Sequence, residues 1–207
     1  MGLREMKAAR TRRQIAEVAV SAFIEHGYDE TTMEQIAELA EIGTSTLYRY
    51  FPSKELLILE PFSEVLDFGH YLRARPADET AGEALAGALL DLADQFSDPS
   101  RRIPDIRRII DASAVPRARL WDIFLDSRAE FEAALAERMG LSQHDHAVQI
   151  SAGIALDIFY RVDEQWKGDH EKDYRVLFRD ALASLSTSPI VLPTIPSRPS
   201  PVGDPVR

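Results

Sequence analysis

Apolar residues recur every three to four positions along almost the whole chain, and this spacing restricts the chain to a helical fold. In the first such run, the apolar side chains from Ile15 to Phe23 share one face of a helix that we expect from about residue 7 to residue 26. No segment alternates apolar and polar residues for long, and no Asn-Gly or Asp-Gly hairpin signal occurs. The sequence therefore predicts an all-α protein of about nine helices.

Capping and breaking residues divide the chain into these helices. Thr32 and Thr80, each followed three residues later by Gln or Glu, form capping-box patterns that begin the second and fifth helices. Pro61 lies inside a fourth helix expected over about residues 54–73, and an interior proline removes a backbone hydrogen bond, so we expect a kink or a break there. Further N-caps are expected at Ser53, Ser142 and Asp169.

The second and third helices are joined by only about three residues, which is the geometry of a helix-turn-helix. Apolar residues from Ile36 to Leu47 would pack this pair against the first helix. The third helix then presents polar side chains outward. Hydroxyl groups bind phosphates or base edges, and arginine pairs with guanine, so these side chains are suited to the major groove. They are Thr44, Ser45, Tyr48 and Arg49.

The run from Thr31 to Leu57, TTMEQIAELAEIGTSTLYRYFPSKELL, resembles the DNA-binding domain of the TetR (tetracycline-repressor) family of transcriptional regulators. The most specific part is its second half, from Thr46 onward, and the resemblance covers about residues 10–57. It implies a sequence-specific, ligand-responsive repressor that binds a palindromic operator as a dimer. It also implies release from DNA by a small, largely apolar effector.

The resemblance assigns roles to individual residues. Thr32 and Tyr48 correspond to phosphate-binding positions, Thr44 and Ser45 to base-reading positions, and Lys54 to a phosphate clamp at a helix N-terminus. Arginines of the N-terminal arm, Arg12 included, could reach the DNA backbone or the minor groove. The expected DNA-binding residues are Arg10, Arg13, Thr32, Thr44, Ser45, Thr46, Tyr48, Arg49, Tyr50 and Lys54.

The turn of the motif departs from the family at two positions, because Glu41 stands where Gly is usual and Gly43 where Ser is usual. A left-handed Glu41 would cost about 1 kcal/mol, so we expect Gly43 to take the unusual dihedral angle instead. Glu41 would also repel phosphate and so tune the affinity for DNA.

Charge gives the DNA-binding interpretation no support. The chain has a formal net charge of −10, and residues 1–54 contain seven Lys or Arg against eight Asp or Glu. The interpretation therefore depends on the motif.

The rest of the chain divides into two further parts. We expect a DNA-binding domain over residues 1–55, a helical ligand-binding and dimerisation domain over 56–186, and a proline-rich tail over 187–207. The tail is expected to be disordered, with an extended arm along a partner subunit as the alternative, since six of its 21 residues are proline. The apolar helices near 143–167 and 169–185 are expected to form a homodimer interface.

Aromatic and aliphatic residues of this second domain could line an effector cavity, although such residues are more often plain core. A fainter resemblance of the eighth helix to the mycofactocin-type regulators implies an acyl-thioester or other lipid-like effector. The expected lining residues are Phe62, Leu66, Tyr71, Phe96, Trp121, Phe124, Leu125, Phe131, Phe159 and Tyr160.

Other classes of function have little in the sequence to favour them. The chain has no cysteine, no signal peptide, no membrane segment and no catalytic or cofactor-binding motif, so we expect a cytoplasmic protein that is not an enzyme and holds no cofactor or metal. The alternatives are a helical protein-interaction module, or a small enzyme, with no role on DNA.

Overall fold

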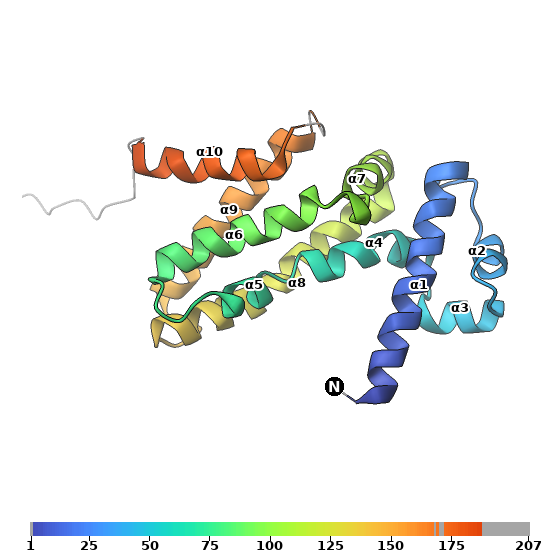
Figure 1. The fold of residues 1–207 in the computed structure, drawn as a ribbon, viewed down its shortest axis with the longest axis horizontal. Coiled ribbons are helices and arrows are strands. Elements are labelled where there is room, and N and C mark those ends of the chain that lie inside the picture. Colours follow the sequence, from blue (N-terminus) through green and yellow to red (C-terminus); the bar gives the residue numbers. More distant parts are fainter. Residues whose placement is uncertain (1, 168, 170–171, 188–207) are drawn as a thin grey trace, which may run out of the picture.

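A computed structural model describes residues 2–167, 169 and 172–187, which form an all-α fold, as predicted (Figure 1). Gly168 and the proline-rich tail beyond Thr187 lie outside the described residues. The helices are α1 (Leu3–His26), α2 (Met33–Leu39), α3 (Thr44–Tyr50), α4 (Lys54–Val65), α5 (Phe68–Ala74), α6 (Ala81–Ser97), the 3-10 helix η1 (Pro99–Arg101), α7 (Ile103–Ala112), α8 (Ala114–Met139), α9 (His146–Lys167) and α10 (Tyr174–Thr187).

Helices α1 to α3 form one end of the molecule, and α4 runs from them into a larger bundle made by α5 to α10 (Figure 1). The buried apolar side chains make one continuous core along this path, from Ile15 on α1 through Phe62 on α4 to Phe178 on α10. Since α4 packs against both α1 and α8, the domain boundary expected at residue 55 stays a prediction.

The break in the long fourth helix lies five residues beyond the proline where we expected a kink or a break. Pro61 remains within α4, and the chain leaves the helix at Leu66. Asp67 then caps α5, because its carboxylate accepts the His70 N–H at 2.9 Å. Two residues after Asp67, Gly69 lets α5 approach α8 closely, since a Cβ there would lie 3.0 Å from the Glu130 carbonyl oxygen. The cap at Asp67 and the close contact of α5 with α8 therefore determine where the long helix breaks.

The capping boxes at Thr32 and Thr80 are confirmed, since each threonine hydroxyl accepts an N–H bond from the third helical residue. Ser53 is the N-cap residue of α4, as expected, although its side chain makes no capping hydrogen bond. The other two expected caps are wrong. Helix α9 begins three residues later than a cap at Ser142 predicts, and α10 begins four residues later than a cap at Asp169 predicts. Aspartates cap them, with Asp145 accepting from Ala147 N and Asp173 from Arg175 N, both at 2.8 Å.

None of the helices in the described part of the chain combines the length and the apolar character that crossing a membrane requires.

Candidate functional site

The turn between α2 and α3 takes a left-handed conformation at Glu41, whose φ is 54°. The Ile42 N–H donates to the Ala37 carbonyl at 3.0 Å across this residue, which closes α2 in the manner of a Schellman motif. Gly43 is extended, with φ −67° and ψ 142°, and caps α3. The expectation that Gly43 takes the unusual dihedral angle is therefore wrong, because the closing hydrogen bond fixes the left-handed residue two positions earlier.

Replacing Glu41 by glycine is expected to raise the free energy of unfolding by up to about 1 kcal/mol, because glycine adopts a left-handed φ without a Cβ clash. Urea unfolding followed by circular dichroism measures the change. Glu41→Ala removes the same charge but keeps the clash, so it should not stabilise the protein. Equal gains from both variants would show that charge and not backbone strain is responsible.

The recognition surface lies on α3, which is held by one fully buried residue, Leu47. The four side chains predicted to enter the groove are all exposed, and Tyr48 retains 43% of its accessible surface. Thr46 and Tyr50, also expected at the DNA, are half-buried, and Tyr50 packs against the core. The helix thus offers a polar outer row: Thr44, Ser45, Tyr48 and Arg49.

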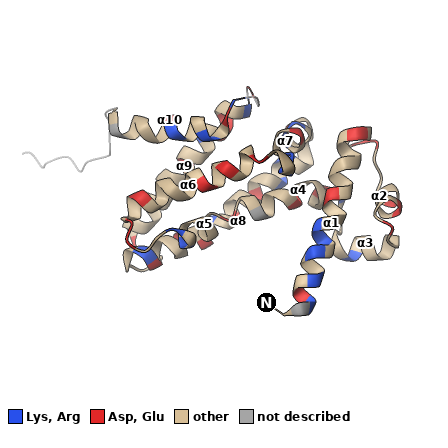
Figure 2. Cartoon of the chain, in the orientation of Figure 1, with Lys and Arg blue, Asp and Glu red and all other residues tan. Residues whose placement is uncertain are grey.

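Basic residues continue this surface along the N-terminal half of α1, where Figure 2 shows them together, whereas acidic and basic residues are interspersed over the larger bundle. Arg10 and Arg13 are exposed there, as a contact with DNA requires. Thr32 is exposed at the start of α2.

Arg12, by contrast, is used within the protein. Its Nε donates to Glu60 Oε1 and its Nη1 to the Tyr50 carbonyl oxygen, both at 2.6 Å. Its guanidinium carbon lies 4.1 Å from the centre of the Phe51 ring. Arg12 therefore joins α1 to the end of α3 and to α4, and we assign it a positioning role in place of the DNA contact expected from the sequence.

Lys54 is likewise directed inward. Its Nζ donates to the carbonyl oxygens of Tyr28, Asp29 and Thr31, at 2.7, 3.4 and 3.2 Å, and lies 4.4 Å from the centre of the Tyr28 ring. A lysine ammonium has three donors, so none is left for a phosphate. In this structure Lys54 secures the loop that leads into Thr32, which differs from the phosphate clamp that the resemblance implied.

Burial raises the pKa of Tyr28 to about 12, with smaller contributions from the carboxylates of Glu55 and Asp29. The phenol hydroxyl of Tyr28 therefore stays protonated, and the side chain is uncharged. An uncharged ring suits the contact with Phe23.

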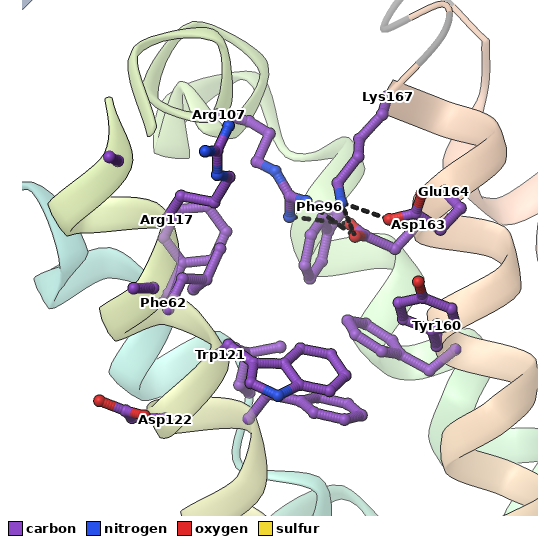
Figure 3. Close-up of a pocket in the computed structure, with 16 residues that line it drawn as sticks. Phe62, Phe96, Arg107, Arg117, Trp121, Asp122, Tyr160, Asp163, Glu164 and Lys167 are labelled. Carbon is purple, nitrogen blue, oxygen red and sulfur yellow. Dashed lines mark hydrogen bonds and ion pairs between the residues drawn. The ribbon is translucent and has the colours of Figure 1, made fainter. Parts of the chain in front are cut away.

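A cavity of about 580 Å³ opens in the larger bundle, with Arg107, Arg117 and Lys167 at its upper side and Trp121 and Asp122 at its lower side (Figure 3). Seven of the ten residues expected to line an effector cavity do so: Phe62, Leu66, Phe96, Trp121, Phe124, Phe159 and Tyr160.

The other three expected residues are not in its wall. Phe131 is fully buried and packs on Phe68, with ring centres 5.6 Å apart. Leu125 keeps 48% of its surface exposed on α8, and Tyr71 lies against His70 on α5, which faces α8. Helical spacing alone does not distinguish a cavity wall from plain core.

The charged end of the cavity contains a buried ion pair that the sequence analysis missed. Arg107 on α7 donates from Nη1 and Nη2 to the two carboxylate oxygens of Asp163 on α9, at 2.9 and 2.8 Å, and from Nε to Asp111 at 3.0 Å. The side chains of Arg107 and Asp163 are only 6% and 8% exposed. Burial alone would lower the pKa of Arg107, but the two carboxylates outweigh it and raise this pKa.

A second cavity, of about 470 Å³, lies between α1, the Pro61 region of α4 and the η1–α7 segment. Arg102, which directly precedes α7 and has a left-handed φ of 54°, lines it and donates from Nη1 to Ser21 Oγ on α1 at 3.4 Å. Helix α7 therefore contacts α1 at one end and supplies Arg107 to the first cavity.

Apolar side chains are exposed on α9 and α10, the two helices predicted to form a dimer interface. They are Ile150, Ile154, Val176 and Leu185.

Comparison with known proteins matches residues 15–60 to the model of the bacterial regulatory proteins of the tetR family. The chain is 43% identical over 88 residues to the transcriptional regulator TcmR of Streptomyces glaucescens, covering 42% of this chain and 39% of TcmR. It is 31% identical over 137 residues to the transcriptional repressor KstR2 of Mycolicibacterium smegmatis, covering 59% of this chain and 67% of KstR2. Among solved structures, a complex of SmeT with triclosan has a TM-score of 0.61 at 20% identity, covering 93% of this chain and 99% of SmeT.

The chain spans less than half the length of TcmR but two thirds of KstR2, and the SmeT likeness concerns the fold. The sequence matches therefore identify the family, and the likeness to the solved structure supports the fold alone.

Proposed function

Because this chain belongs to the TetR family of bacterial transcriptional regulators, we propose that it is a repressor that binds a palindromic operator as a dimer and leaves it when a small molecule fills the cavity of about 580 Å³. The family consists of regulators and not of enzymes. The observation that carries the proposal is the exposed polar row of α3, Thr44, Ser45, Tyr48 and Arg49, on a helix anchored by buried Leu47.

Dimerisation through α9 and α10 is part of the proposal. Two recognition helices must be separated by about 34–36 Å, or a multiple of this distance, to read successive half-sites on one face of DNA. The exposed Ile150 and Ile154 on α9, with Val176 on α10, support such an interface, because exposed apolar patches mark association surfaces.

Release by an effector is supported by the position of the cavity. Phe62 of α4, Leu66 directly after it and Arg107 of α7 line the cavity, and both helices also pack against α1 of the DNA-binding unit. A ligand that shifts either helix would change the position of α1, and through it that of α3. The printed names of the relatives agree with this role, since KstR2 is a repressor and SmeT is seen with the small molecule triclosan.

Operator binding tests the proposal. The protein should bind a duplex from its own upstream region, and the affinity should fall steeply with salt because phosphate contacts release counterions. Tyr48→Phe should weaken binding to all sequences, whereas Thr44→Ala and Ser45→Ala should change which base pairs are preferred. Electrophoretic mobility shifts on a set of substituted operators measure both effects.

A dimer with no affinity for duplex DNA would refute the operator proposal and favour a helical protein-interaction module instead. Equal sequence preference in wild type and Thr44→Ala would refute the base-reading assignment alone.

A further inference from the structure

We infer that the cavity of about 580 Å³ accepts a flat aromatic molecule that carries a single acidic group. This inference rests on the proposed effector role of the cavity and adds the chemistry of the ligand. Its volume is within the roughly 300–1,000 Å³ typical of small-molecule sites, so one ligand of moderate size fills it.

The charges on the cavity wall are matched except at one residue. Within the described part of the chain, each lining carboxylate contacts a cation: Asp163 contacts Arg107, Glu164 contacts Lys167, and Asp122 contacts Arg119. The remaining lining cation is Arg117, on α8.

Arg117 reaches from α8 towards α7 (Figure 3), where its Nη1 donates to the Asp111 carbonyl oxygen at 3.1 Å. The structure gives it no carboxylate partner among the described residues. A guanidinium has five N–H donors in a planar fork that fits a carboxylate, and a single contact to a neutral carbonyl leaves most of them available. Arg117 is therefore suited to receive the acidic group of a ligand.

The opposite end of the cavity is built from aromatic rings. The Trp121 and Phe124 rings stack with centres 5.0 Å apart, and Phe124 stacks on Phe159 at 5.4 Å. Trp121 and Tyr160 meet edge to face at 5.7 Å, and they still keep 47% and 41% of their surfaces exposed. A flat ring system would cover these exposed aromatic surfaces in an offset stack.

The same arrangement disfavours other ligands. An acyl thioester of coenzyme A would bring several phosphate charges to a wall with one unmatched cation among the described residues, and that cation can pair with only one of them. A cationic ligand would meet Arg117 with no carboxylate free to pair with it. One acidic group on an aromatic body matches both ends of the cavity.

The test uses anthracene-2-carboxylate and its uncharged analogue anthracene-2-carboxamide, titrated into the full-length protein by calorimetry. The wild-type protein should bind the carboxylate about ten- to hundredfold more tightly than the carboxamide, because only the carboxylate can form a hydrogen-bonded ion pair with Arg117. Arg117→Gln should abolish this preference and leave the affinity for the carboxamide unchanged. Arg128→Gln, on the same helix, is the matched control and should keep the preference, because neither Arg128 nor its partner Glu132 lines the cavity.

Equal binding of the two anthracenes to wild type, or no binding of either, would overturn the inference. Tighter binding of lauroyl-CoA than of the aromatic acid would overturn it as well. Operator affinity measured in parallel separates the inference from the proposed function. Release of the protein from its operator by lauroyl-CoA but not by the aromatic acid would keep the repressor proposal and refute the inferred ligand class. Tight binding of the aromatic acid without release from the operator would keep the ligand class and refute the proposed release by an effector.

Discussion

Replacing Asp163 by alanine is expected to lower the free energy of unfolding by about 3–5 kcal/mol, because it leaves the Arg107 guanidinium buried without its bidentate partner. Only 6% of the Arg107 side chain is exposed, so water replaces the lost carboxylate poorly. Asp111 contacts Arg107 through Nε alone and does not reach the two Nη groups that Asp163 holds. Urea unfolding followed by circular dichroism measures the loss.

The matched control lies on the same helix. Asp157 pairs with Arg161 at 2.7 Å, but their side chains are 55% and 72% exposed, so Asp157→Ala should leave the free energy of unfolding close to the wild-type value. The double variant Arg107→Met/Asp163→Leu removes both buried charges and should recover most of the stability. If Asp163→Ala and Asp157→Ala lowered the free energy of unfolding equally, the importance assigned to the buried pair of Arg107 and Asp163 would be refuted.

Replacing Lys54 by methionine is expected to weaken operator binding about ten- to hundredfold, the equivalent of roughly 1.5–3 kcal/mol for a hydrogen bond to a charged group. The substitution removes the donor shared by the carbonyls of Tyr28, Asp29 and Thr31, so the loop that leads into Thr32 loses its order. The slope of log K against log salt concentration should stay at the wild-type value, because no phosphate contact is lost. Fluorescence anisotropy over a salt series measures both quantities.

Arg10→Met shows what the loss of a direct phosphate contact does to the salt dependence, for comparison with Lys54→Met. Arg10 is exposed on α1, and loss of a phosphate contact should reduce the salt slope by about 0.9 for each contact removed. A similar reduction in Lys54→Met would show that Lys54 does bind phosphate and that its inward position changes on DNA.

The sequence predicted those parts of the molecule that local rules determine. Thr32 and Thr80 cap their helices because each hydroxyl accepts from a backbone N–H only three residues along the chain, so the contact needs no distant partner. Leu47 is buried and Tyr48 exposed because helical periodicity assigns each residue to a face. The break at Asp67 was not predictable in this way, since it also depends on how closely α5 meets Glu130 on α8.

The site was harder to predict because its chemistry depends on pairs far apart in the chain. Arg107 and Asp163 are 56 positions apart, and neither has a partner that the sequence reveals as buried. One signal was present: each charged residue interrupts an apolar face, Arg107 between Ile106 and Ile110, and Asp163 between Phe159 and Trp166. Lys54 was assigned to phosphate because a resemblance transfers a residue's position and not the direction of its side chain.

Arg12 also determines where this chain can be cut. A fragment that ends at residue 55 would contain the whole helix-turn-helix but would lack Glu60, which accepts from Arg12 Nε at 2.6 Å. The guanidinium that holds the end of α3 through the Tyr50 carbonyl would then lose its ionic partner. The smallest piece that keeps the recognition helix fastened as it is in the full chain therefore extends past Glu60 to the end of α4, at Val65.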